Sequence, residues 1–398
     1  MRILLGLTAG ISLVPGAALA QQGAPERRLD FNVAMVLEYD SNVIGVSDAL
    51  LQPGDSEDDI RATPTASIDL LLPVGRQSVF LNGSVGYDFY AENKRLEAER
   101  VGLTGGVVIS AGNSCSVTLT GDYGSSQSDP GDLLERDDLR NTQETIGYGG
   151  NVDCGSAIGL QGSAGYRRIE VDNSSAIRQF SNFSSDTFDA SIGYARPALG
   201  EISIFGTWSE GVYPNRVTLP GLPQEEIESY TAGLRYSRNI GSRLRGEVSV
   251  GFTDVSSNQP GVPDFSGASY SASLSFTPND QASATLLVAR AVDQSNLLNV
   301  SFSITDTYSA DAQYALSQRI RLRTGISYRT RELRENPLLD VVTLGRDDRV
   351  LRSYGGISYV VERGPGLSLD IGGERRRADN RLFNFSSFFA ALTTRYSF

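Results

Sequence analysis

The sequence has no histidine and only two cysteines, and these absences remove several classes of protein. Ser-His-Asp hydrolases, Cys-His proteases and histidine-based zinc or iron sites are excluded. Cys115 and Cys154 cannot form a four-thiolate metal site by themselves. We therefore expect a protein that is not an enzyme and that binds no metal or cofactor.

Long apolar runs are also missing. No segment reaches the roughly 18 apolar residues that a membrane-spanning helix needs. The run from Ile3 to Pro15 follows the positive Arg2 and precedes a small-residue site at Ala18–Ala20. This pattern predicts a signal peptide over 1–20, because a membrane anchor would need a longer and uninterrupted run. We expect a short periplasmic segment over 21–28 and one domain over 29–398.

Positive charge is scarce, with 35 Lys and Arg against 47 Asp and Glu and a net charge of −12. Nucleic acid is therefore an unsuitable partner, since its phosphates would be repelled.

Short alternating segments fill the rest of the sequence. Eighteen segments with apolar residues at every second position recur from Leu29 to the end, as in Phe31, Val33, Met35, Leu37 and Tyr39. A period of two indicates strands with two different faces. The connections alternate between short turns such as 73–77 and long ones such as 40–59 and 331–348. This asymmetry is typical of an up-and-down antiparallel barrel in the bacterial outer membrane, with short periplasmic turns and long extracellular loops.

Aromatic residues favour the barrel over a soluble β-sandwich, which would explain the alternation equally well. They fall at strand ends, as the girdles of a lipid-facing barrel require. Strands running outward end on Tyr39, Phe89, Tyr123, Tyr166, Trp208, Phe252 and Tyr328, and strands running inward end on Tyr148, Tyr194, Tyr236, Phe276, Tyr314, Tyr359 and Phe398. We therefore predict an all-β transmembrane barrel of about eighteen strands.

The last segment ends on Phe398, inside an alternating strand. Unpaired backbone groups in lipid cost several kcal/mol each, so the last strand must pair with the first. A terminal aromatic also resembles the signal that barrel-assembly machinery reads in outer-membrane proteins.

Cys115 and Cys154 lie at the periplasmic end of one predicted hairpin. Because the periplasm is oxidising, we predict a disulfide between them. The alternative is two unpaired thiols.

Polar residues between the apolar ones are expected to line an aqueous lumen. The candidate pore-lining residues are Asp69, Asp88, Asp122, Arg235, Arg245, Arg321, Arg323, Arg329 and Arg352. In a ring of eighteen strands the acids partly oppose the arginines, which suggests a field across the lumen. The alternative is a set of local arginine–carboxylate pairs that brace the wall. The loops 40–59 and 331–348 are candidates for a segment that folds into the lumen.

Four acidic residues in the first long loop, Asp55, Glu57, Asp58 and Asp59, raise the question of calcium. They lack the ordered spacing and the glycine of a calcium-binding loop. A solvated external loop is the better interpretation.

The first hundred residues resemble the putative β-barrel porin 2 family. The resemblance lies in an alternating strand that enters Tyr39-Asp40-Ser41-Asn42, followed by a strand that carries Thr63-Pro64. It implies an outer-membrane conduit for a secreted exopolysaccharide, working with a periplasmic polysaccharide export protein. The alternative is a general or selective diffusion porin for small polar or anionic nutrients. Either channel would lie among outer-membrane lipid and lipopolysaccharide.

Overall fold

The computed structural model describes residues 27–51, 53–128, 141–216, 223–295, 297, 300–339, 345–361 and 364–398. The predicted signal peptide, 1–20, lies outside these residues. Among them, no helix has the length and apolar character needed to cross a bilayer.

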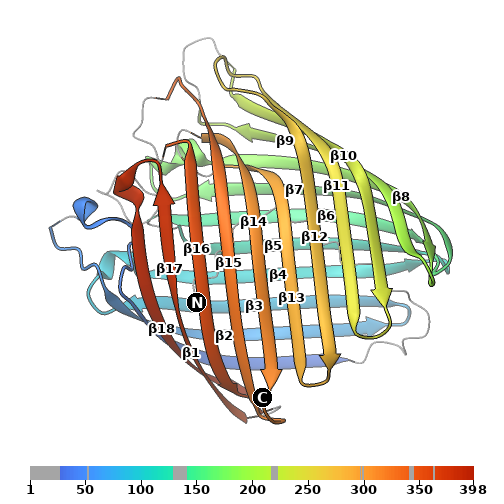
Figure 1. The fold of residues 1–398 in the computed structure, drawn as a ribbon, viewed down its shortest axis with the longest axis horizontal. Coiled ribbons are helices and arrows are strands. Elements are labelled where there is room, and N and C mark those ends of the chain that lie inside the picture. The colour runs from blue at the N-terminus through green and yellow to red at the C-terminus, as the bar shows by residue number, and fades with distance from the viewer. Residues whose placement is uncertain are drawn as a thin grey trace.

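Eighteen antiparallel strands form one closed sheet, which confirms the predicted fold (Figure 1). The strands are β1 (Arg28–Asp40), β2 (Asp59–Val74), β3 (Gln77–Tyr90), β4 (Ala98–Ala111), β5 (Cys115–Gln127), β6 (Thr142–Gly155), β7 (Gly159–Asn173), β8 (Phe183–Arg196), β9 (Gly200–Tyr213), β10 (Glu225–Ile240), β11 (Leu244–Ser257), β12 (Phe265–Asn279), β13 (Ala282–Gln294), β14 (Val300–Ala315), β15 (Ile320–Glu335), β16 (Asp347–Tyr359), β17 (Gly364–Ala378) and β18 (Phe385–Ser397). Short 3₁₀ turns lie in the long loops: η1 (Asp48–Leu50), η2 (Lys94–Leu96), η4 (Arg178–Ser181) and η5 (Arg381–Phe383).

The barrel closes between its first and last strands. β1 pairs antiparallel with β18 from Asn32–Ser397 to Asp40–Phe389. The Phe398 amide donates to the Phe31 carbonyl, with 3.0 Å between the nitrogen and the oxygen. This distance is typical of a backbone hydrogen bond in a sheet. The aromatic terminus therefore lies within the sheet, as the sequence predicted, and no sheet edge is left in lipid at this seam.

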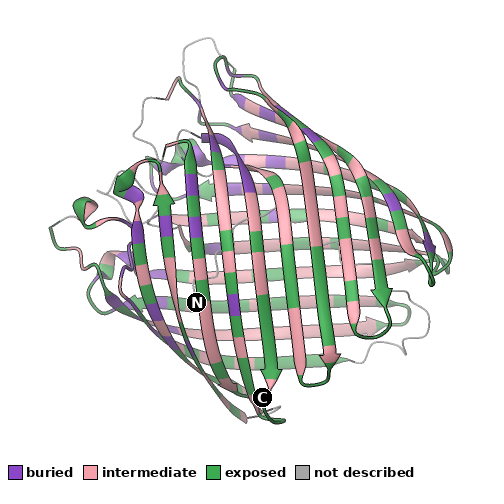
Figure 2. Cartoon of the chain, viewed as in Figure 1, coloured by how far each residue is buried: buried purple, intermediate pink, exposed green. Residues whose placement is uncertain are grey.

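The outer face carries the apolar residues. Leu29, Phe31, Val33, Met35 and Leu37 on β1 are all exposed, and the same holds on most strands (Figure 2). Exposed apolar side chains at every second position form the surface that faces lipid. The predicted aromatic residues lie on this outer face.

One aromatic was assigned to the wrong end. Tyr148 was predicted at the periplasmic end of its strand, but it lies in the middle of β6, opposite Gly121 and Arg168. β6 continues past it to Gly155, so Tyr148 lies in the extracellular half, near Tyr123 and Tyr166.

The periplasmic turns are short. The β2–β3 turn consists of Gly75 and Arg76, and Gly75 has φ 64°, a left-handed conformation that favours glycine. The β5–β6 hairpin is closed at its periplasmic end by a disulfide between Cys115 and Cys154, which are directly opposite with Cα atoms 4.1 Å apart.

Candidate functional site

The inner face of the barrel is polar and charged. Every second residue of each strand points into it, since its neighbours carry the exposed apolar side chains. Ion pairs between neighbouring strands run along this wall, so the candidate pore-lining residues differ in how far they are neutralised.

The three predicted pore-lining acids are all paired with arginines. Asp69 contacts Arg28 at 2.6 Å, Asp88 contacts Arg100 at 2.5 Å, and Asp122 contacts Arg167 at 2.7 Å. Asp88 is also buried and accepts a hydrogen bond from Thr63. These acids therefore brace the wall, and they give the lumen little net negative charge.

Several predicted arginines are braced in the same way. Arg235 lies 3.7 Å from Glu247, Arg352 lies 3.6 Å from Glu374, and the Arg323 Nε donates to Asp370 at 2.7 Å. Arg329 faces inward between Thr307 and Val350. In the described part of the chain, Arg245 and Arg321 are exposed inner-face arginines that form no ion pair.

The predicted pore-lining set omitted other inner-face charges, among them Asp153, Asp189, Glu201 and Arg395. Asp153 on β6, Asp189 on β8 and Glu201 on β9 form no ion pair with another described residue. Arg395 on β18 is exposed, and its guanidinium donates to the Asn32 amide oxygen. All four occupy polar positions in alternating segments, so the same alternation could have found them. We call Asp153, Asp189 and Glu201 the acid wall, and Arg245, Arg321 and Arg395 the arginine wall.

Two members of each wall lie on opposite sides of the lumen, whereas Arg245 on β11 is only two strands from Glu201 on β9. In the ring order, β6 is nine strands from β15 and β9 is nine strands from β18. Asp153 therefore lies across from Arg321, and Glu201 across from Arg395. After the local pairs are removed, Asp153 and Glu201 remain across from Arg321 and Arg395, while Asp311 on β14 accepts a hydrogen bond from the Tyr354 hydroxyl on the arginine side. The acids of this arrangement are not those that the sequence suggested.

A second feature is that β13 separates from β12 at the extracellular end, while β14 stays paired with β15 up to Val300–Glu335. β12 pairs with β13 only from Tyr270–Arg290 downward, so residues 265–269 of β12 pair with β11 alone. Residues 291–294 pair only with β14. We call the described residues of 291–304 the inward hairpin, since Leu297, Val300 and Phe302 bury their side chains against elements across the mouth.

The inward hairpin packs on the inner faces of strands across from it. Phe302 is fully buried in an apolar cluster with Tyr213 on β9, Ile227 on β10 and Val255 on β11. The Tyr213 hydroxyl donates a hydrogen bond to the carbonyl of Ser295 or of Ser301 and accepts one from the Ser295 amide. Each of these distances is 3.0 Å. The two segments proposed from the sequence, 40–59 and 331–348, contribute Leu50, Leu333 and Asn336 to the contacts around the hairpin, and residues 52 and 340–344 lie outside the described residues.

The hairpin tip also contacts the opposite side of the mouth. Leu297 and Val300 are buried with Leu333 of β15 and Phe383 of η5, and Leu50 of η1 packs against them. Contacts thus run from β7–β11 through the hairpin tip to the loops beside β18 and β1. The described loops narrow the extracellular mouth along this line.

A buried ion pair joins these loops. Arg216 and Glu225 have fully buried side chains 3.3 Å apart. The Arg216 guanidinium also donates to the Phe180, Leu297 and Val300 carbonyls at 2.7, 2.7 and 3.0 Å. Its Cζ lies 3.8 Å from the centre of the Tyr213 ring. The hydrogen-bonding capacity of the guanidinium is thus well used, as burial of a charge requires.

Glu225 is satisfied from two other elements. The Ser301 hydroxyl donates to one carboxylate oxygen, and the Asn336 side-chain amide donates to the other at 3.2 Å. We call Tyr213, Arg216, Glu225, Ser301 and Asn336 the loop hub. It ties the loops after β7, β9, β13 and β15 to one another at the mouth.

The acidic residues of the first loop serve the loop structure. Asp59 is buried and accepts from the backbone amides of Ala91, Glu92 and Asn93. Asp55 pairs with Arg95. Within the described residues, no group of three or more possible ligands is arranged to hold a metal ion.

Comparison with known proteins gives one family match. Residues 229–397 match the family described as Putative beta-barrel porin 2, which confirms the resemblance found in the sequence. The matched range does not include the first hundred residues that carried that resemblance. No curated protein matches this chain. The family match and the closed barrel together locate the protein in the bacterial outer membrane.

Solved structures of similar shape come from two bacteria. Pseudomonas aeruginosa OccK2 (OpdF) in complex with glucuronate has 11% identity and a TM-score of 0.48, with 95% of this chain and 100% of that chain covered. Acinetobacter baumannii OccAB3 has 10% identity and a TM-score of 0.47, with 94% and 99% covered. Pseudomonas aeruginosa OpdK with vanillate has 11% identity and a TM-score of 0.47, with 93% and 99% covered.

Proposed function

We propose that the protein is a selective diffusion channel for small polar solutes that carry an anionic group. The proposal depends on one observation: Arg321 and Arg395 lie across from Asp153 and Glu201 in a lumen whose mouth is narrowed by the inward hairpin. Arginines without a carboxylate partner attract carboxylate and phosphate groups. A dipolar or anionic solute would turn its negative end toward Arg321 and Arg395.

The narrowed mouth favours small solutes over a polymer. An exopolysaccharide conduit, the first interpretation of the sequence, needs a passage that stays open along the whole chain of sugars. The hairpin tip lies where such a polymer would leave, held by the loop hub and by the cluster around Phe383. The structure offers the conduit no matching support.

The proposal is tested by ion selectivity in planar bilayers. The triple substitution Arg245→Gln, Arg321→Gln, Arg395→Gln should shift the reversal potential toward cations, and Asp153→Asn, Asp189→Asn, Glu201→Gln should shift it toward anions. Arg196→Gln, an outward-facing change, is the control. Unchanged selectivity in both triple variants would refute the proposal.

A transport assay gives a second, independent readout. Liposomes containing the channel should take up small carboxylates faster than uncharged analogues of equal size, and the arginine triple variant should lose this difference. If deletion in the bacterium instead abolished a surface polymer and left small-solute uptake unchanged, the conduit would replace the diffusion channel.

A further inference from the structure

The outer face of β16 and β17 ends in arginines. Along β17 the outward residues are Leu367, Leu369, Ile371 and Gly373, followed by Arg375 and Arg377. Along β16, Leu351 is followed toward the extracellular end by Arg349. All three arginines are exposed, and none forms an ion pair with another described residue. We call Arg349, Arg375 and Arg377 the arginine patch.

The arrangement is unfavourable unless an anion is bound. Arg349 and Arg377 are direct cross-strand neighbours on the same face, and like charges in that position repel. The nearest outward carboxylate on these strands is Asp347, two residues from Arg349. In a chain with a net charge of −12, three neighbouring arginines without partners stand out.

The depth of the patch matches that of lipid headgroups. Arg375 follows the apolar residues of β17 within four residues of Ile371, and a strand rises about 3.3 Å per residue. Charged side chains at the boundary of the apolar belt meet the phosphates of the neighbouring leaflet. On this side of the barrel, that is the outer leaflet.

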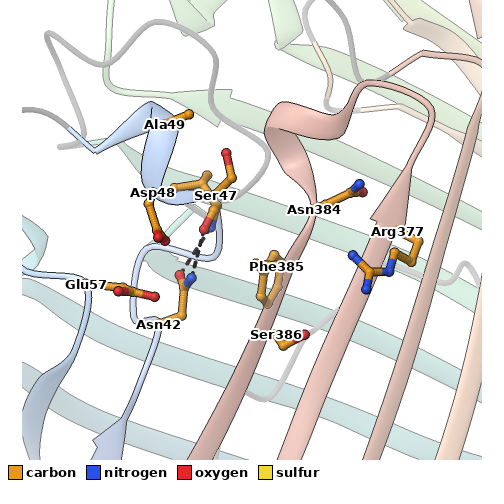
Figure 3. Close-up of a pocket in the computed structure, with 10 residues that line it drawn as sticks. Asn42, Ser47, Asp48, Ala49, Glu57, Arg377, Asn384, Phe385 and Ser386 are labelled. Atoms are coloured by element: carbon orange, nitrogen blue, oxygen red, sulfur yellow. Dashed lines mark hydrogen bonds between the residues drawn. The ribbon is translucent and has the colours of Figure 1, made fainter.

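A hollow beside the patch is lined by polar groups. Its volume is about 420 Å³, and it lies between the first loop and the β17–β18 end, with Arg377, Asn384 and Ser386 on one side and Ser47, Asp48 and Glu57 on the other (Figure 3). The Ser47 hydroxyl is buried and has no hydrogen-bond partner. The hydroxyl, amide and carboxylate groups of the hollow can form hydrogen bonds with the hydroxyl groups of a sugar. The carboxylates of Asp48 and Glu57 would repel a phosphate, so a bound phosphate would lie beside the arginines.

The opposite arc of the rim carries outward carboxylates, of which Asp186 is paired with Arg168 at 2.7 Å. The first charged outward residues above Phe188, Trp208 and Tyr230 are Asp186, Glu210 and Glu228, which are cross-strand neighbours on β8, β9 and β10. These strands lie about half a turn of the ring from β17. Phosphate would be repelled there in the absence of a bridging metal ion.

We propose that the arginine patch and the hollow beside it bind the headgroup of a phosphorylated glycolipid of the outer leaflet. The arginines hold its phosphate, and the hollow receives its sugar. The site lies outside the lumen and does not depend on the proposed solute.

The test is binding of lipid A to the full-length protein in detergent, measured by native mass spectrometry with EDTA present so that carboxylates cannot bind through metal ions. Arg349→Gln, Arg375→Gln, Arg377→Gln should weaken binding roughly 100-fold, since each arginine near an anionic surface contributes about a fivefold change. Arg196→Gln, Arg238→Gln, which removes two outward arginines near the periplasmic end, is the matched control.

Ligand variants separate the possible sources of phosphate. Lipid A should bind more tightly than its dephosphorylated form and than phosphatidylglycerol, and inorganic phosphate should not compete at millimolar concentration. The three-lysine variant, which keeps the charge, should retain most of the binding. The proposal is overturned by unchanged binding in the glutamine variant, by equal loss in the control, or by equal competition from inorganic phosphate. Retained heat-modifiable migration on gels verifies that each variant is folded.

Discussion

The extracellular half of the barrel interior is packed with buried side chains, whereas the periplasmic half is lined with exposed charge. Both halves use arginine–carboxylate pairs. Arg216 and Glu225 are fully buried, while Arg323 and Asp370 remain partly exposed. Water screens the Arg323–Asp370 pair but does not reach the Arg216–Glu225 pair. An arginine–carboxylate pair therefore holds the loops together in the extracellular half, whereas in the periplasmic half it sets the charge of the lumen.

The largest expected effect comes from breaking the buried pair. Arg216→Met leaves the Glu225 carboxylate buried without its cation and removes three hydrogen bonds to loop carbonyls, which should destabilise the docked loops by about 3–5 kcal/mol. Single-channel conductance should rise, and the extracellular loops should become sensitive to protease.

The control for this change is Arg245→Met, an exposed arginine of the periplasmic half. It should leave protease resistance as it is in the parent protein. If Arg216→Met had no greater effect on conductance and protease resistance than Arg245→Met, the loop hub would not hold the mouth.

The periplasmic end has a covalent tie instead. Replacing both Cys115 and Cys154 by serine should lower stability by up to about 4 kcal/mol, the chain-entropy value for a loop of this length. The unfolding midpoint in denaturant, with the oxidised parent protein as the reference, measures the loss, and the reduced parent protein should match the variant. Because the hairpin ladder keeps its register, conductance should not change, and a changed conductance would show that the bond shapes the lumen.

A smaller effect is expected from an exposed pair. Asp370→Asn leaves Arg323 without its carboxylate, and the screened pair contributes at most about 1 kcal/mol. The added positive charge should instead move the reversal potential toward anions, while Asp254→Asn on the outer face should not. A large loss of stability with no shift in selectivity would contradict the contrast between the two halves.

The smallest effect concerns pH at the first loop. Burial, followed by the nearby Asp48 and Asp58, raises the pKa of Glu57. The folded loop therefore binds the Glu57 proton more tightly than the open loop does. The stability of the folded loop increases as the pH falls from above the raised pKa to the ordinary carboxyl range. The Val43 amide, which donates to the Glu57 carbonyl at 2.8 Å, should exchange more slowly at low pH after correction for intrinsic rates. Glu57→Gln should remove this dependence.

Much of the barrel follows from the order of residues. The alternation from Phe31 to Phe398 determines which face meets lipid, and lipid then requires that β1 and β18 pair. The positions of Cys115 and Cys154 at the end of one hairpin bring them opposite each other for the same local reason. Strand period and hairpin pairing are short-range properties, so a single sequence contains them.

The ion-pair partners of the inner-face charges could not be predicted from the alternation of the sequence. Asp88 and Asp122 looked like pore-lining acids until the register placed Arg100 and Arg167 beside them. A shift of one residue between strands would turn each of these side chains to the other face. Neutralisation therefore depends on the register of each pair of strands.

The inward hairpin shows most clearly what the sequence alone left undecided. Residues 300–304 alternate like any wall strand, and the sequence by itself determined only that they form one. Their position inside the mouth was decided by Tyr213, Arg216 and Glu225, which lie more than 75 residues earlier and meet them only in the closed barrel. The burial of Phe302 and the hydrogen bonding of the buried Arg216–Glu225 pair depend on residues far apart in the sequence. These interactions form only when the tertiary structure brings the hairpin and β9–β10 together.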